Sequence, residues 1–72
     1  MQKFYVIKNK ENGKLINFIL LGRGGVVREI KYTNDHRFAL NFENREEPQA
    51  TITFIGAVMD WELEEQLEIS EV

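Results

Sequence analysis

The opening stretch, residues 4–21 (FYVIKNKENGKLINFILL), constrains the fold of this chain more than any other part of the sequence. Two apolar runs, Phe4–Ile7 and Leu15–Leu21, flank a polar segment that contains Asn12-Gly13. An Asn-Gly pair is a strong hairpin signal because it tolerates the backbone angles of a tight turn. The stretch therefore predicts a β-hairpin. Because the chain has only 72 residues, its core has to form against a face of this hairpin.

The chain is long enough for one domain only, residues 1–72. A chain of this size buries only about 60% of its unfolded surface, so we expect marginal stability. It has no cysteine for a disulfide, and we hold homodimer formation as a hypothesis for burying more area. Trp61, Phe54 and Phe42 are expected in the core, because a small domain needs its largest side chains inside. There is no apolar run as long as a membrane span, and Met1–Phe4 lacks the layout of a signal peptide, so we expect a cytoplasmic protein.

Charge is distributed unevenly along the chain. Residues 1–31 hold seven lysines and arginines against two glutamates, whereas residues 60–72 hold six carboxylates and no base. These carboxylates are Asp60, Glu62, Glu64, Glu65, Glu68 and Glu71. Opposite charges on neighbouring strands stabilise a sheet modestly, so the two segments could pair within the molecule. Alternatively, the acidic segment offers its carboxylates to a partner with a basic surface.

Apolar and polar residues alternate in several further segments, which predicts strands. The expected strands are Lys3–Lys8, Lys14–Leu21, Val26–Tyr32 and Met59–Ser70. In the last of these, only Glu65 breaks the alternation, which predicts a half-buried strand with an outer face of carboxylates. Residues 22–25 (GRGG) are interpreted as a flexible turn. Residues 37–43 are expected to form a short extended segment that buries Phe38, Leu40 and Phe42 on one face.

The segment after Asn44 admits two interpretations. Asn44 followed by Glu47 has the form of a capping box, and apolar residues follow at helical spacing over Pro48–Met59. Gly56 stands where a glycine would end such a helix. Against a helix, Thr51–Ile55 is rich in β-branched and aromatic residues, which favours a strand. By propensity alone, helix and strand are even.

Three pieces of the chain carry a family resemblance. They read FYVIKNKENGKLINF, YTNDHRFALNFENREE and DWELEEQLEISEV, and together they cover over half of the chain. This chain resembles short proteins that are common in phages and prophages of Gram-positive bacteria. In such proteins an amphipathic helix follows the double glutamate, so the resemblance implies a helix over Arg45–Gly56, although Pro48 stands where alanine is usual. It also implies a phage-derived protein that acts in the cytoplasm of the host cell.

The expected fold is therefore α+β, with a small antiparallel sheet packed on one helix. The alternative is an all-β barrel of five or six strands.

The residue inventory argues against an enzyme. His36 is the only histidine and Ser70 the only serine, so no pairing of a nucleophile with a base is expected. One histidine among scattered carboxylates gives no ligand spacing for zinc, and the sequence has no calcium-binding loop. We expect no catalytic residue, no metal site and no cofactor.

The sequence favours a non-enzymatic interaction protein that binds and modulates a host protein, for example by inhibiting a defence nuclease. In this hypothesis the six carboxylates of residues 60–71 bind a basic surface of the partner. The alternative is a small nucleic-acid-binding module. It would use basic residues of the opening hairpin and the turn after it, namely Lys8, Lys10, Lys14 and Arg23. The net charge of −3 argues against nucleic-acid binding.

Overall fold

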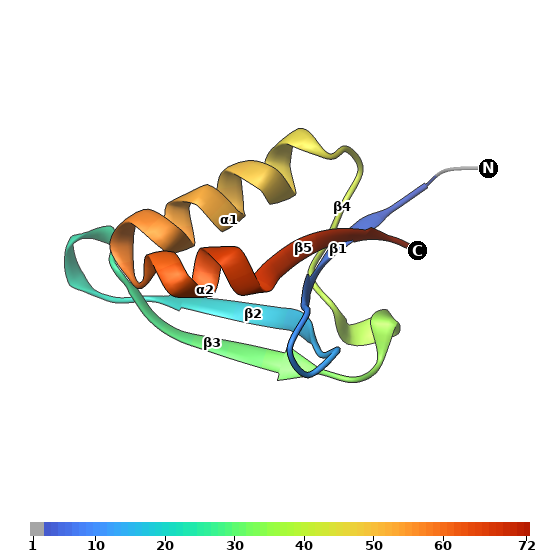
Figure 1. The fold of residues 1–72 in the computed structure, drawn as a ribbon, viewed down its shortest axis with the longest axis horizontal. Helices are drawn as coiled ribbons and strands as arrows, with labels where there is room; N and C mark the ends of the chain where they lie inside the picture. Colours follow the sequence, from blue (N-terminus) through green and yellow to red (C-terminus); the bar gives the residue numbers. More distant parts are fainter. Residues whose placement is uncertain (1–2) are drawn as a thin grey trace.

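A computed structural model describes residues 3–72 and shows an α+β fold (Figure 1). The strands are β1 (Tyr5–Asn9), β2 (Leu15–Leu21), β3 (Val27–Thr33), β4 (Asn41–Phe42) and β5 (Leu67–Glu71). The helices are α1 (Glu46–Val58) and the shorter α2 (Trp61–Gln66), with 3-10 turns η1 (Arg23–Gly25) and η2 (His36–Phe38). All strand pairs are antiparallel. The predicted fold class is confirmed, and the all-β alternative is wrong.

The strand β1 lies at the centre of the sheet. One of its edges pairs with β2 near Lys8 and with β4 at Tyr5 and Val6, and the other edge pairs with β5 along its whole length. Val6 and Ile7 are both fully buried. Because neighbouring side chains in a strand point to opposite faces, both faces of β1 are covered by the rest of the chain.

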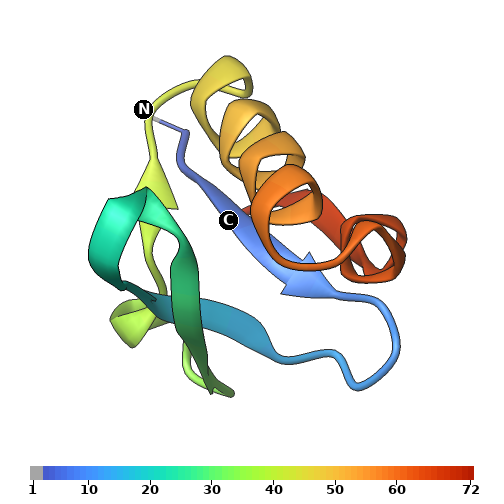
Figure 2. The same ribbon diagram turned by 90° about the vertical axis from the view of Figure 1, so that its left-hand side faces the viewer.

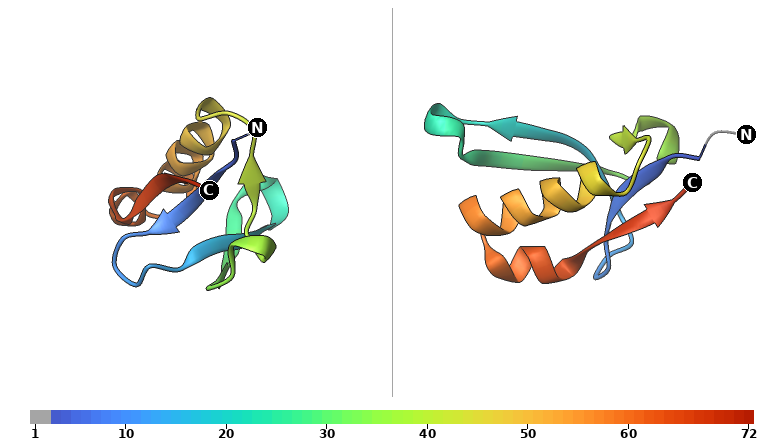
Figure 3. Two further views of the ribbon diagram at one scale, coloured as in Figure 1. Left: turned by 90° about the vertical axis from the view of Figure 1, so that its right-hand side faces the viewer. Right: turned by 90° about the horizontal axis from the view of Figure 1, so that it is seen from above.

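The β2–β3 ribbon lies on one side of α1, and α2 with β5 lies on the other (Figures 2 and 3). A single buried cluster joins these elements. It consists of Ile7, Ile16, Val27, Ile52, Ile55 and Leu67, which come from β1, β2, β3, α1 and β5. The molecule is elongated, with extents of 38 × 23 × 20 Å. The core therefore sits where the ribbon, the helix and the central strand meet.

The predicted opening hairpin is present, and Asn9 holds its turn. The backbone N–H of Asn9 donates to the carbonyl of Lys14 at 2.8 Å, and the Asn9 carbonyl accepts from Gly13 N–H at 2.8 Å. The side-chain Oδ1 of Asn9 accepts from the N–H of Glu11 at 2.9 Å. Gly13 has a φ of 74°, a conformation that favours glycine, so the Asn-Gly signal marks the turn for a local physical reason.

The helix α1 begins at the predicted capping signal. Oδ1 of Asn44 accepts a hydrogen bond from the N–H of Glu47 at 2.9 Å, which satisfies one of the free donors of the first turn. The stripe that α1 buries consists of Pro48, Ile52 and Ile55. The hydroxyl of Thr51 donates to the carbonyl of Glu47 at 2.9 Å, so this β-branched residue is accommodated within the helix.

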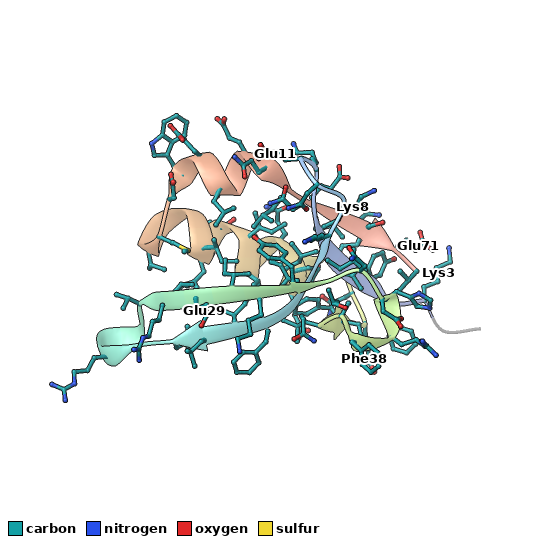
Figure 4. The ribbon with its side chains drawn as sticks, turned by 90° about the horizontal axis from the view of Figure 1, so that it is seen from below. Lys3, Lys8, Glu11, Glu29, Phe38 and Glu71 are labelled. Atoms are coloured by element: carbon teal, nitrogen blue, oxygen red, sulfur yellow. The ribbon has the colours of Figure 1, made fainter. Side chains whose placement is uncertain are left out.

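The segment of residues 37–43 does not bury the predicted apolar face. Its first residues belong to η2, and β4 has only two residues. Phe38 is 64% exposed and projects away from the sheet (Figure 4), whereas Ala39 is buried. The side chain of Asp35 accepts hydrogen bonds from the N–H and guanidinium of Arg37, which favours a turn and lowers the pKa of Asp35. The guanidinium of Arg37 in turn lies 5.8 Å from the centre of the Phe38 ring.

Residues 59–70 do not form one strand, which corrects the prediction for this segment. Trp61–Gln66 is helical, and only Leu67–Glu71 is extended. Oδ1 of Asp60 accepts from the N–H of Glu62 at 2.9 Å and so caps the helix. Glutamate, glutamine and leucine are good helix formers, and carboxylates are favourable near a helix N-terminus. The alternating pattern of residues 59–70 is therefore realised as a strand only from Leu67 onward.

Gly56 lies inside α1 rather than at its end, which also corrects the prediction. A Cβ atom at this position would lie 2.7 Å from the Cβ of Glu64 and 2.8 Å from its Cδ. Such distances are too short for carbon atoms that are not bonded, so only glycine lets α1 and α2 approach this closely.

We predict that Gly56→Ala lowers the free energy of unfolding by about 1–3 kcal/mol, because α1 and α2 must separate to admit the methyl group. The intrinsic preference of helices for alanine would by itself raise stability by about 1 kcal/mol, so the two effects have opposite signs. Urea unfolding followed by circular dichroism measures the difference. In a double-mutant cycle, Glu64→Gly should reduce the loss, because it removes the Cβ that the new methyl group meets. A Gly56→Ala protein as stable as the natural one would contradict the close packing.

Candidate functional site

The acidic segment, residues 60–71, places its six carboxylates on two elements. Asp60 caps α2, three of the others lie in α2, and the last two lie in β5. In chain order these five are Glu62, Glu64, Glu65, Glu68 and Glu71. Glu64 is half-buried and the other carboxylate residues are exposed. The carboxylates therefore do not form the single row along a strand that the sequence predicted. They surround a short helix and continue along the strand that follows it.

The basic residues of the first 31 positions form an ion pair with the acidic segment only at its end. Nζ of Lys3 lies 3.2 Å from Oε1 of Glu71, and Figure 4 shows the two side chains together. Lys8 stands opposite Glu68 in the register of β1 and β5. Within residues 3–72, Lys3–Glu71 is the only ion pair that involves the acidic segment. An exposed pair of this kind contributes little to stability. Among the residues that the structure describes, the other carboxylates of the acidic segment form no ion pair.

Apolar side chains are exposed beside this negative charge, at the corner between α1 and α2. This apolar corner consists of Phe54, Val58, Met59 and Trp61, which are 40%, 37%, 46% and 63% exposed. The prediction that Trp61 and Phe54 lie in the core is wrong, whereas Phe42 does pack against the buried cluster. Trp61 is the first residue of α2, and most of its surface is exposed to solvent. Tryptophan, phenylalanine and methionine are the residue types that are enriched at protein–protein interfaces, and polar residues form their rim.

A groove lies between α1 and β5. It consists of two adjoining hollows of about 710 and 330 Å³, which share Arg45, Gln49 and Ile69. The remaining lining residues are Glu46, Ala50, Ile52 and Thr53 of α1, Glu64 of α2, and Leu67 and Glu68 of β5. We call this feature the α1–β5 groove. The sequence pattern does not predict this groove, although the spacing of four between Arg45, Gln49 and Thr53 places them on one helix face.

The basic residues of the nucleic-acid alternative do not form one patch. Lys8 lies in β1, and Lys10 and Lys14 lie in the turn before β2. Arg23 lies in η1, at the other end of β2. The seven residues of β2 separate these positions by about 20 Å. No observation in the structure therefore favours nucleic-acid binding by this set of residues.

The residues considered for catalysis lie on different elements. His36 is exposed in η2, and Ser70 is half-buried in β5. Within residues 3–72, no group of three or more potential ligand side chains is arranged to hold a metal ion. In the same part of the chain, every buried side-chain nitrogen or oxygen has a hydrogen-bond partner.

None of the helices described is long and apolar enough to cross a membrane.

We predict that Trp61→Ala changes the free energy of unfolding by at most about 1 kcal/mol, because most of this side chain is already in water. Ile55→Ala is the matched control, since Ile55 is fully buried in the neighbouring helix α1. This substitution should lower the free energy of unfolding by about 2–5 kcal/mol. Urea unfolding followed by circular dichroism compares the two variants. Equal losses would mean that Trp61 is a core residue after all.

Comparison of the chain with protein-family models, with curated proteins and with solved structures found no match. Any function of the chain has therefore to be inferred from its own surface.

Proposed function

We propose that this chain is a non-enzymatic interaction protein that binds a host protein with a basic surface, in the cytoplasm of the host cell. The proposed binding surface combines the carboxylates of the acidic segment with Trp61 and Met59 of the apolar corner. One observation carries the proposal. Trp61 is 63% exposed, and its two neighbours in the chain, Asp60 and Glu62, are exposed carboxylates.

The two kinds of side chain have different roles in this proposal. Tryptophan is enriched among the residues that dominate binding energy, because it buries a large apolar area against a partner. The surrounding carboxylates attract a basic partner over a longer range and raise the rate of association. They also exclude acidic partners through repulsion between like charges.

The geometry of α2 supports this role because local contacts hold the helix in place. Asp60 caps its N-terminus, and the close contact between Gly56 and Glu64 holds it against α1. A surface that is already ordered loses less conformational entropy on binding than a flexible one.

The concrete form that we propose is inhibition of a host nuclease. Nucleases bind the phosphate backbone through lysine and arginine side chains. Carboxylates of the acidic segment would bind those cations and exclude the nucleic acid. The resemblance of the chain to short phage proteins supports a host protein as the partner.

We expect the tagged chain to capture a host protein from lysate at low salt and to lose most of it at high salt, because screening weakens interactions between exposed charges. A triple variant, Glu62→Gln with Glu65→Gln and Glu68→Gln, should abolish the capture. The matched control, Glu11→Gln with Glu29→Gln and Glu43→Gln, changes the net charge equally at exposed positions outside the acidic segment and should retain it. Mass spectrometry of the bound fraction identifies the partner, and a nucleic-acid cleavage assay then tests inhibition.

Trp61→Ala should also abolish capture while leaving the fold intact. The proposal fails if no partner is captured at either salt concentration. It fails equally if the two triple variants lose the partner to the same extent, because net charge alone would then explain binding.

A further inference from the structure

We propose that the α1–β5 groove binds an extended, basic segment of the partner protein, which pairs with β5 as an added strand. This inference rests on the proposed function and specifies how the partner is held. It follows from the hydrogen bonding of β5, the position of the groove and the charges that line it.

The hydrogen bonds of β5 show which of its backbone groups are free. The carbonyl of Gln66 accepts from the N–H of Lys10 at 2.8 Å, and the N–H of Val72 donates to the carbonyl of Phe4 at 2.9 Å. In an antiparallel pair, the backbone groups of alternate residues point toward the partner strand. In residues 66–72, the backbone groups of the even-numbered residues therefore point toward β1. The backbone groups of Leu67, Ile69 and Glu71 point away from it.

Few of these outward groups are used elsewhere. The N–H of Leu67 donates to the carbonyl of Glu64 at the end of α2. Within residues 3–72, β5 pairs only with β1, so the N–H and carbonyl of Ile69, the carbonyl of Leu67 and the N–H of Glu71 remain open. An open row of this kind is a template for pairing with another chain.

The groove borders this open edge. Leu67, Glu68 and Ile69 line the smaller hollow together. Because side chains alternate between faces, three consecutive residues border one hollow most simply when it runs along the edge of the strand. Gln49 of α1 lines both hollows and Ala50 lines the larger, so α1 forms the opposite wall. A strand in this position would lie beside the open edge of β5 and next to the face of α1 that lines the groove.

Charge and polarity define the occupant. The groove is lined by Glu46, Glu64 and Glu68 against one cation, Arg45. The guanidinium of Arg45 is held 5.4 Å from the centre of the Tyr5 ring. In a strand added to β5, alternate side chains would meet Ile69 and α1 on one face and Glu68 on the other. The matching segment therefore alternates apolar and basic residues.

The test uses a displayed library of short peptides in which lysine or arginine alternates with randomised positions. Peptides enriched on the natural chain are then synthesised and titrated against it. Hydrogen exchange is measured residue by residue, with and without the peptide. The amides of Ile69 and Glu71 should exchange rapidly in the free protein and become protected on binding. The amides of Ser70 and Val72 should be protected in both states, because they already face β1.

The matched variants are Ile69→Pro and Ile69→Val. Proline at an outward-facing position removes one open donor and leaves the ladder to β1 intact. Loss of one such hydrogen bond should weaken peptide binding about tenfold, whereas Ile69→Val keeps the N–H and should weaken binding much less than Ile69→Pro does. Circular dichroism verifies that both variants are folded. If Ile69→Pro does not fold, the protection pattern of the natural chain decides alone.

The inference is overturned if no peptide is enriched, or if bound peptides leave the amides of Ile69 and Glu71 unprotected. Its failure can be distinguished from failure of the proposed function. If capture of a host protein depends on Trp61 but the amide of Ile69 stays unprotected, the proposed strand addition is wrong and the proposed function still holds. Conversely, if peptides protect these amides but no host protein is captured, the groove is a peptide-binding site and the proposed function is wrong.

Discussion

The structure depends on one strand, β1, which is covered on both faces and paired with other strands along both edges. Val6 and Ile7 are both fully buried although they point in opposite directions. The remaining strands either pair with β1 directly or, as in β3, reach it through one neighbour. A small chain can bury only a few side chains completely, and here β1 supplies two of them. The placement of both candidate surfaces follows from this strand, because β5 is positioned by β1 and α2 leads directly into β5.

The parts of the fold that could be predicted have local signals. Asn12-Gly13 marks the opening turn within a few residues, and Asn44 marks the start of α1 through its contact with Glu47. Pro48, Ile52 and Ile55 then give the helix a buried stripe despite the β-branched residues around them. In each case the interaction that decides the structure joins residues close together in the sequence, so the pattern contains the necessary information.

The region of the candidate site could not be predicted as well, because its deciding contacts compete or are distant. The alternation from Met59 onward predicted a strand, whereas in the structure Asp60 caps a short helix by accepting a hydrogen bond from the N–H of Glu62. The contact of Gly56 with Glu64 depends on how two helices pack, which no single stretch of sequence records. The same holds for the α1–β5 groove, since the open edge of β5 becomes evident only once the pairing with β1 is known.

The pairing of β5 with β1 joins residues that are far apart in the sequence, because Ile7 lies opposite Ile69. During synthesis the first strand leaves the ribosome long before its partner, and in that interval one edge and part of one face of β1 stay uncovered. Such contacts between distant residues slow folding, and exposed strand edges invite aggregation. Completion of the core therefore depends on Leu67–Glu71, and a chain that lacked this strand would leave one edge of β1 open.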